Sequence, residues 1–343
     1  MKKYFILLIM ACQSVIVLSQ ENKTPYLTKS LANAGIKNVY VSTSGGSITV
    51  SGASGQEPRV EVYITGNNGF TPSNDEIKKR LEENYTLDIT VNNGEIRAVA
   101  KNKHDGNWDW HRSLNIAFKV YVSKDVATNL QTSGGSIHLD NLNGEEKFET
   151  SGGSLHIDHL VGKIHGRTSG GSISVSNSKN DLDLETSGGS IHADNCSGTI
   201  KLGTSGGSLH LDQLDGKIDA STSGGSVSAS NIKGELHTGT SGGSVNLTGL
   251  ACSLDTYTSG GSIHVQMTEA SKFVKIDASG GHVDLQLSSK QGYNLNLHAD
   301  RVTADVGGNF DGTKEKDKVE GKLNGGGINV DVNGSSRINL TLN

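Results

Sequence analysis

The sequence predicts an all-β protein whose single chain winds into a β-solenoid of 18-residue coils. Only 33% of its 343 residues are hydrophobic and 5% aromatic, which suits a stack of thin coils better than a thick globular core. The net charge of −5 and the regular placement of the apolar residues argue against disorder. The period comes from the tetrad Thr-Ser-Gly-Gly, which begins every 18 residues at Thr132, Thr150, Thr168, Thr186, Thr204, Thr222, Thr240 and Thr258.

Residues 1–19 have the pattern of an export signal. Lys2 and Lys3 precede an apolar run over residues 4–17, and Val17-Leu18-Ser19 supplies the small or apolar residues of a cleavage site. We expect cleavage after Ser19 and export to the periplasm, the outer surface or the medium. Lipoprotein anchoring at Cys12 is the competing interpretation, which the apolar residues beyond Cys12 disfavour. Later segments fall short of the about 20 apolar residues that a transmembrane span needs.

Residues 20–130 form a β-rich segment with one short helix before the repeats begin. Ser73-Asn74-Asp75-Glu76 is a capping box, which predicts a helix over residues 73–84. A separate copy of the tetrad begins at Thr43. Alternation of apolar and polar residues predicts strands over 36–41, 47–50, 59–65, 86–91, 96–101 and 114–122.

The solenoid spans residues 131–275, and each coil is numbered here from its Thr. Positions six, eight and fifteen are apolar in nearly every coil, except that the first coil places Phe148 two residues after position fifteen. This alternation predicts short strands with one buried face, and the Gly pair and the Gly or Asn at position thirteen predict corners. We expect coils about 4.8 Å apart, with the Thr of position one pointing inward in a hydrogen-bonded column. Tandem hairpins are the alternative, which the fixed period disfavours.

Residues 276–343 are expected to form a β cap, because an uncovered terminal coil would be a strand edge prone to association. The segment Lys314–Lys318 reads as a charged, exposed loop. Cys196 and Cys252 lie three coils apart at different coil positions, so we expect no disulfide between them. The predicted strands of the cap are 283–287, 295–298, 302–306, 328–332 and 338–342.

Outward positions seven and nine carry His and Asp in two consecutive coils and Ser in the third. This three-coil unit occurs twice and gives His138, Asp140, His156, Asp158, His192, Asp194, His210 and Asp212. Stacking would place Asp over Asp, which is unfavourable without a cation, so each group is a hypothetical site for zinc or another divalent ion. The alternative is that each protonated His compensates the adjacent Asp on an exposed surface.

A second candidate is the loop Asn107-Trp108-Asp109-Trp110-His111, which contains both tryptophans. The rings of Trp108 and Trp110, flanked by Asp109 and His111, suit stacking on a sugar. The alternative is that these rings cap the first coil.

The repeated TSGGSI, the strand predicted over 114–122 and the Gly-rich tail ending INLTLN resemble the bacterial putative-adhesin family with β-strand repeats. The resemblance covers most of the mature chain. It implies a β-solenoid in a cell-envelope protein, and it brings no functional residues because the family is a domain of unknown function.

Several function classes fit the sequence poorly. The coils are too tight to carry the long loops of β-helical lyases, the repeated Ser has no base of its own, and no phosphate-loop spacing occurs. A net charge of −5 lacks the basic footprint of nucleic-acid binding. We therefore expect an exported, non-enzymatic protein that displays repetitive polar faces to a surface glycan or protein. The alternatives are a self-assembling envelope scaffold and a carbohydrate-binding protein that uses the Trp108/Trp110 loop. No cofactor is expected beyond the hypothetical metal.

Overall fold

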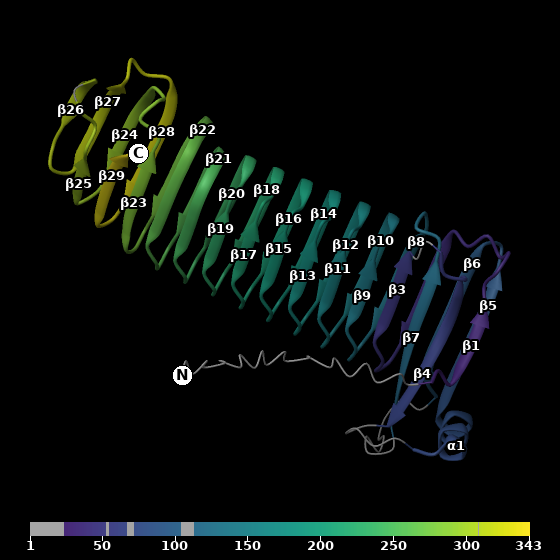
Figure 1. The fold of residues 1–343 in the computed structure, drawn as a ribbon. Helices are drawn as coiled ribbons and strands as arrows, with labels where there is room; N and C mark the ends of the chain where they lie inside the picture. Colours follow the sequence, from purple (N-terminus) through teal and green to yellow (C-terminus); the bar gives the residue numbers. More distant parts are fainter. Residues whose placement is uncertain (1–23, 53–54, 67–71, 104–112, 308) are drawn as a thin grey trace, which may run out of the picture.

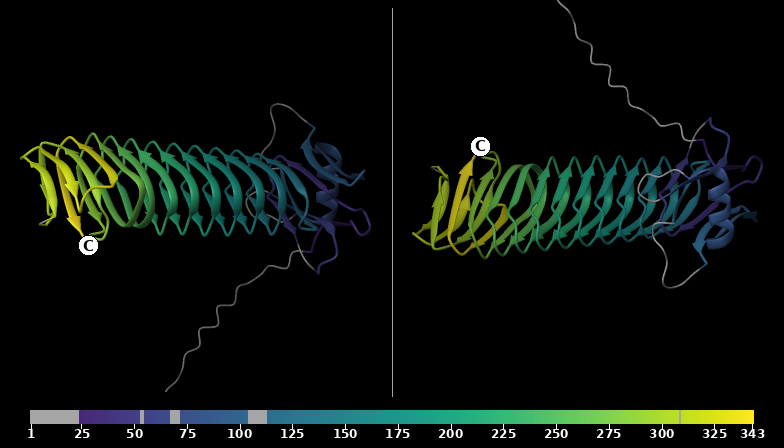
Figure 2. Two further views of the ribbon diagram at one scale, coloured as in Figure 1. Left: turned by 90° about the horizontal axis from the view of Figure 1, so that it is seen from above. Right: turned by 90° about the horizontal axis from the view of Figure 1, so that it is seen from below.

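The computed structural model describes residues 24–52, 55–66, 72–103, 113–307 and 309–343. These residues form a long array of strands with one helix, which confirms the predicted all-β solenoid (Figure 1). Seen from above and below, the coils stack into an elongated body with the helix at the N-terminal end (Figure 2). The predicted export signal and Cys12 lie outside the described residues.

Each coil of the repeat supplies a short strand and a long strand, and successive coils pair in parallel 18 residues apart, as in Leu155 with Ile173. The short strands are β9 (Ile137–Asp140), β11 (Leu155–Asp158), β13 (Ile173–Ser176), β15 (Ile191–Asp194), β17 (Leu209–Asp212) and β19 (Val227–Ser230). The long strands are β8 (Ala127–Thr132), β10 (Asn143–Thr150), β12 (Val161–Thr168), β14 (Lys179–Thr186), β16 (Ser197–Thr204), β18 (Asp215–Thr222) and β20 (Lys233–Thr240). Short and long strands merge in β21 (Val245–Thr258) and β22 (Ile263–Ala278).

The core consists of rows of side chains that run along the solenoid axis. Positions six, eight and fifteen are buried as predicted, and positions eleven and seventeen add two further rows. Cys196 occupies position eleven and Cys252 lies in β21; both are buried, free thiols, and burial raises their pKa to about 11 and about 12. Burying an aliphatic side chain completely contributes about 1.5–3 kcal/mol of transfer free energy. The side chains of one coil are buried largely against the adjacent coils, so a coil is stable only with a neighbour on each side.

The first coil departs from the apolar pattern in a way that the structure explains. Its position fifteen is Glu146, which is completely buried, and its Phe148 is the inward residue at position seventeen. The Phe148 ring fills the space above Gly166 in the next coil, where an added Cβ would lie 2.2 Å from Phe148 Cε2. A large residue in one coil is thus matched by the absence of a side chain in the next.

The Thr of position one points inward, as predicted, and bonds to backbone rather than to other hydroxyls. The hydroxyl of Thr168 donates to the carbonyl of Gly153 in the preceding coil at 2.7 Å and accepts from the N–H of Gly171 at 3.3 Å. At position five, Ser172 donates its N–H to Ser154 Oγ at 3.3 Å. Both contacts recur from coil to coil, so Thr and the second Ser of Thr-Ser-Gly-Gly-Ser hold the corner together.

Two corners need unusual backbone for different reasons. Position thirteen has positive φ in coils two to six, with 132° at Gly162 and 84° at Asn180, as the sequence predicts. Position ten of the same corner has positive φ in coils one to seven, as at His159 with 53°. The Gly pair has no such φ within the repeats. Its second member is required by close approach, because a Cβ on Gly171 would lie 2.0 Å from the carbonyl oxygen of Gly153.

Replacing Thr204 by Val is expected to lower the free energy of unfolding by about 1–3 kcal/mol, since it leaves a buried carbonyl and an N–H without partners. The Thr204 hydroxyl donates to the Gly189 carbonyl at 2.7 Å and accepts from the Gly207 N–H at 3.3 Å. The matched control is Ser205→Ala, which alters an exposed hydroxyl. Urea unfolding followed by circular dichroism compares the two; equal midpoints would contradict the role assigned to Thr.

The N-terminal end closes with a coil that is out of sequence order. β2 (Asn38–Thr43) and β3 (Ile48–Gly52) pair directly with β8 and β9, so the separate tetrad at Thr43 stacks on the tetrad at Thr132. The Thr132 hydroxyl donates to the Gly46 carbonyl at 2.8 Å. On the other side of β2 and β3 lie β6 (Glu95–Asn102) and β7 (Leu114–Val122).

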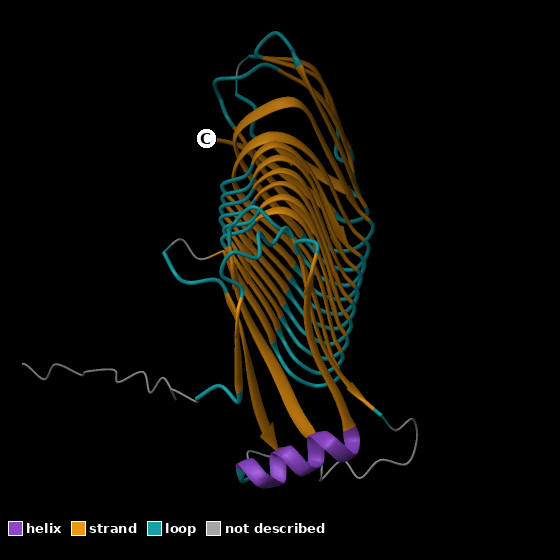
Figure 3. Cartoon of the chain, turned by 90° about the vertical axis from the view of Figure 1, so that its right-hand side faces the viewer, coloured by secondary structure: helices purple, strands orange, loops and turns teal. Residues whose placement is uncertain are grey.

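Antiparallel strands and the helix finish this end. β1 (Leu27–Ser30) pairs with β4 (Arg59–Gly66), β4 with β7, and β5 (Tyr85–Asn92) with β6. The helix α1 (Asn74–Asn84) begins after Ser73, whose hydroxyl accepts from the Glu76 N–H, as the capping box predicts. It lies beyond the ends of the N-terminal strands (Figure 3).

The C-terminal end repeats this arrangement. β28 (Ile328–Gly334) and β29 (Arg337–Leu342) insert between β22 and β23 (His282–Leu287) on one side and β24 (Tyr293–His298) and β25 (Arg301–Ala304) on the other. The predicted exposed loop over Lys314–Lys318 is confirmed for residues 315–317 and is wrong for the two lysines at its ends. Lys314 ends β26 (Phe310–Lys314) and Lys318 begins β27 (Lys318–Leu323), which form an antiparallel hairpin. β26 is exposed along most of its length, so its sequence lacks the alternation that marks a strand.

Candidate functional site

The predicted His residues stack in pairs. The rings of His138 and His156 have centroids 4.5 Å apart with an interplanar angle of 15°, and those of His192 and His210 are 4.6 Å apart at 21°. Burial, followed by repulsion from the neighbouring ring, lowers the pKa of His138 and of His192. One ring of each pair, His138 and His192, therefore favours the neutral imidazole.

The Ser coil of each unit binds the Asp of the coil before it. Asp158 Oδ1 accepts from the Ser176 hydroxyl at 2.7 Å and from the Asn177 amide at 2.8 Å. Burial raises the pKa of Asp158, but the hydrogen bonds from Asn177, Ser176 and His159 outweigh burial, so the net shift is downward. Asp212 repeats the contacts with Ser230 at 2.6 Å and Asn231 at 3.0 Å, and these bonds lower its pKa. The His-Asp, His-Asp, Ser-Ser rhythm thus has a structural basis.

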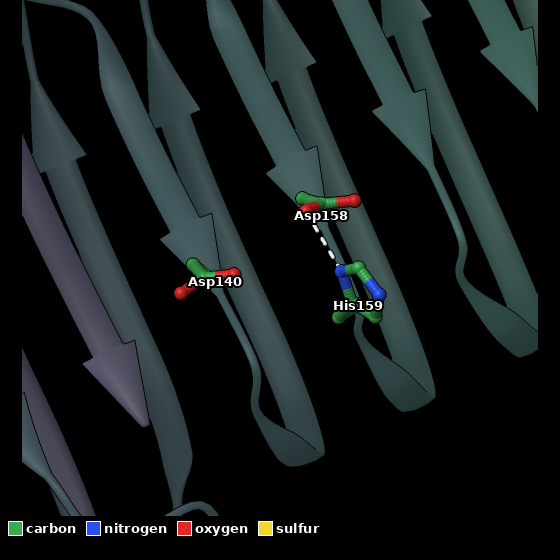
Figure 4. A group of neighbouring side chains, drawn as sticks. All are labelled: Asp140, Asp158 and His159. Carbon is green, nitrogen blue, oxygen red and sulfur yellow. Dashed lines mark hydrogen bonds and ion pairs between the residues drawn. The ribbon is translucent and has the colours of Figure 1, made fainter. Parts of the chain in front are cut away.

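The structure brings two of the predicted metal ligands, Asp140 and Asp158, together with a histidine that was not predicted. Ligand atoms of Asp140, Asp158 and His159 lie within 4.8 Å of one another, and the Asp158–His159 contact measures 2.7 Å (Figure 4). His159 was not predicted; it sits at the corner after the short strand. In the second unit Gln213 stands at the matching corner position, and the described residues form no second group of this kind. Divalent-metal binding stays a prediction, with one group in place of two equivalent ones.

The structure does not test the sugar-binding loop predicted from the two tryptophans. Trp108, Asp109, Trp110 and His111 all lie in the segment 104–112, outside the described residues.

One Ser does have its own base, contrary to the sequence prediction. Ser262 Oγ lies 3.0 Å from Nδ1 of His282, and Nε2 of His282 lies 3.2 Å from Asp284 Oδ2. His282 stands at position five of the last tetrad, where other coils have Ser, so stacking brings its ring onto the Ser of the preceding coil. The irregular tetrad Ala278-Ser279-Gly280-Gly281 followed by His is the sequence signal that could have found it.

The amide groups around Ser262 are already engaged. The Ser262 N–H donates to Ser244 Oγ at 3.3 Å, the Gly261 N–H to Thr258 Oγ1 at 3.2 Å, and the His282 N–H to Ser262 Oγ itself at 3.3 Å. Acyl transfer needs free donors aimed at the developing oxyanion, and these three are committed to the coil stack. The Ser-His-Asp chain is therefore better explained as part of the position-five ladder.

An open groove of ≈ 1000 Å³ follows the corner where the long strands turn into Ser-Gly-Gly. It extends over consecutive coils from β6 through β2 to β18. One side is formed by the outward residues of position eighteen, which are Gln131, Glu149, Arg167, Glu185, Gly203 and Ser221. The other side is formed by the exposed Ser of position two, called here the serine row: Ser133, Ser151, Ser169, Ser187 and Ser205.

The groove is polar and its charges largely compensate one another. Arg167 and Glu185 form an ion pair at 3.3 Å, and Lys201 reaches Glu185 at 3.0 Å. The hydroxyls of the serine row make no hydrogen bond within the part of the chain that the structure describes. Sequence reasoning missed this groove because it treated the whole tetrad as a corner, whereas the first Ser has no side-chain role in that corner.

Comparison with known proteins adds little. No family model matches the chain, and no curated protein matches it. A solved structure described as a putative cell adhesion protein from Clostridium sporogenes is similar at 11% identity with a TM-score of 0.21, covering 92% of this chain and 98% of that one. A TM-score this low carries no argument about function. In the described part of the chain, every helix is too short or too polar to cross a membrane.

Proposed function

We propose that this chain is an exported, non-enzymatic adhesion protein of the bacterial cell envelope, which binds its ligand along a repetitive polar face. The observation that carries the proposal is the serine row, in which identical hydroxyls line a groove at one-coil spacing and make no hydrogen bond to any described residue. The predicted export signal and the resemblance to the adhesin family are consistent with it.

A repetitive surface suits adhesion for a physical reason. Each exposed hydroxyl contributes only about 0.5–1.5 kcal/mol to binding. Once one repeat of a polymer is held, the next repeats bind at high effective concentration, so weak contacts add up to useful affinity. A rigid stack of coils keeps the spacing constant and reduces the entropy cost of binding.

The engaged amides around Ser262 support a non-enzymatic role. A nucleophile without an oxyanion site lacks the contribution that is usually largest in acyl transfer. The side chains of His282 and Asp284 are also 43% and 37% exposed, so the pair is open to water instead of enclosed.

The scaffold alternative is supported less well. Among the described residues, the solenoid ends in antiparallel pairs, β5 with β6 and β26 with β27, and the parallel strand β25, paired with β29, is only four residues long. These ends differ from the coils of the repeat, so a second copy would not continue the stack in the register of the repeat.

A binding screen tests the proposal. Purified mature protein, residues 20–343, is applied to an array of bacterial and host polysaccharides and matrix proteins, and ester and glycoside hydrolysis are assayed in parallel. The proposal expects saturable binding to at least one surface and no turnover. Turnover that is lost in Ser262→Ala would overturn the non-enzymatic assignment, and an array without any binding would overturn adhesion.

A further inference from the structure

The corner motif has one side chain that the fold does not use. Thr, the second Gly and the second Ser of Thr-Ser-Gly-Gly-Ser are fixed by contacts between coils, as in Thr186, Gly189 and Ser190. The first Ser, such as Ser187, contributes a backbone carbonyl that accepts from Gly206 at 2.9 Å, which any residue could supply. Its hydroxyl bonds to none of the residues in the described ranges, and Ser187 lines the groove.

The side of the groove formed by position eighteen suits a long, narrow occupant. Along this position, Glu185 is followed by Gly203 and Ser221, so the surface is low over these coils. Beyond them the ring of Tyr257 lies over Gly239, where an added Cβ would be 2.5 Å from Tyr257 Cδ1. The half-buried ring of Tyr257 thus lies at position eighteen past the last coil of the groove.

The groove runs across the strands, and this orientation disfavours an extended peptide. Peptides that add to a sheet bind through backbone groups at its edge. Here the backbone groups of the long strands pair with the coils on either side, as in β14 with β12 and β16. A peptide lying along the axis would therefore find no row of backbone partners.

Charge disfavours nucleic acid and highly charged polymers. Glu149 and Glu185 would repel phosphates, and Arg167 is already paired with Glu185. Lys101 is the other cation of the lining, so the groove offers no row of positive charges. Free hydroxyls, compensated charges and an aromatic face match a polymer of neutral sugars, whose hydroxyls exchange hydrogen bonds with Ser and whose rings stack on Tyr.

We infer that the groove between the serine row and position eighteen binds a neutral, linear polysaccharide whose chain runs parallel to the solenoid axis. This inference rests on the proposed adhesion function and names its site and ligand class. Successive sugars contact successive coils, which are about 4.8 Å apart. Affinity is therefore expected to rise with oligosaccharide length until the groove is filled.

Gly203 provides a clean way to block the groove. A Cβ at Gly203 would meet only Glu185 Cγ at 3.6 Å, an ordinary contact, so Gly203→Trp can be introduced without strain in the coil. The bulky ring would then fill the groove from the position-eighteen side. Asn246→Trp is the matched control, because Asn246 is an exposed residue of β21 on the opposite, short-strand face.

The experiment is calorimetric titration of the mature protein with di-, tetra- and hexasaccharides of the cello, xylo and chito series. At least one series is expected to bind more tightly with length, with Gly203→Trp weakening the hexasaccharide at least about tenfold. Asn246→Trp should bind like the wild type, and both variants should keep its thermal midpoint. Equal affinity of Gly203→Trp and wild type would overturn the site. Failure of every series to bind would overturn the neutral polysaccharide as the ligand. If the binding array described under the proposed function still detects a protein or a charged ligand, the adhesion function stands and only the ligand class fails.

Discussion

Replacing Gly171 by Ala is expected to destabilise the solenoid by about 3 kcal/mol or more, because the added methyl group overlaps backbone atoms. Its Cβ would lie 2.0 Å from the carbonyl oxygen of Gly153 and 2.4 Å from the carbonyl carbon. These atoms belong to the preceding coil and cannot rotate away, so the coils must separate at this corner. Separation would also break the hydrogen bond from the Thr168 hydroxyl to the Gly153 carbonyl.

The adjacent residue supplies the control. A Cβ on Gly170 would meet the Ser151 carbonyl oxygen at 3.5 Å, which is an ordinary contact. Gly170→Ala is therefore expected to be neutral or slightly stabilising, since it reduces the entropy of the unfolded chain. Thermal unfolding followed by circular dichroism separates the variants. Similar losses in both would show that the Gly pair is needed for its flexibility and not for close stacking.

Replacing Glu146 by Gln is expected to stabilise the protein by about 3 kcal/mol at about pH 8 and to have little effect at about pH 5. Burial raises the pKa of Glu146 to about 7, and the hydrogen bond from Thr128 only partly opposes this. The Thr128 hydroxyl donates to Oε2 at 2.5 Å, while Oε1 is buried without a partner. An ionised carboxylate at this place is therefore costly.

The direction of the pH effect follows from the folded-state pKa. Because this pKa is above that of the unfolded chain, the contribution of Glu146 to stability is complete at acidic pH and is lost as pH rises through about 7. Glu145→Gln is the control, since Glu145 is exposed beside Lys147. Between about pH 5 and about pH 8, the unfolding midpoint of Glu146→Gln should depend less on pH than that of the wild type. The midpoint of Glu145→Gln should follow the wild type. A pH profile unchanged from wild type would contradict a buried, protonated Glu146.

Much of the fold could be predicted because the tetrads recur at a constant spacing of 18 residues. Equal spacing of the tetrads fixes the coil, and alternation at positions six and eight fixes which residues face inward, as at Leu155 and Ile157. Glu146 could not be predicted as buried, because a charged residue in an apolar slot reads as a break in the pattern. The strands β1 and β26 also lacked a signal, since both lie largely exposed.

Contacts between distant segments were beyond the sequence. The tetrad at Thr43 looked separate because residues 53–126 intervene, although in space it is the neighbour of Thr132. Similarly, β28 and β29 enter the stack out of order at the other end. The 18-residue repeat does not indicate these pairings, because they join segments that are distant in the sequence. They form because each terminal coil of the solenoid has an edge that must be covered.

The candidate site could be predicted only in part. The repeat correctly indicated His over His and Asp over Asp. It did not reveal that Ser176 and Asn177 bind Asp158, or that His159 turns toward the carboxylates, because both depend on the shape of the corner. The groove depends in the same way on how the Ser-Gly-Gly corner meets the long strands.

The central claim is that the repeated motif divides its residues between two tasks: Thr, the second Gly and the second Ser hold the coils, while the serine row binds the ligand. The most direct measurement is hexasaccharide titration, together with thermal unfolding, of a variant in which Ser151, Ser169, Ser187 and Ser205 are all Ala. Binding should weaken at least about tenfold, given about 0.5–1.5 kcal/mol per hydrogen bond, with the unfolding midpoint unchanged. Unchanged affinity, or a marked loss of stability, would contradict the claim.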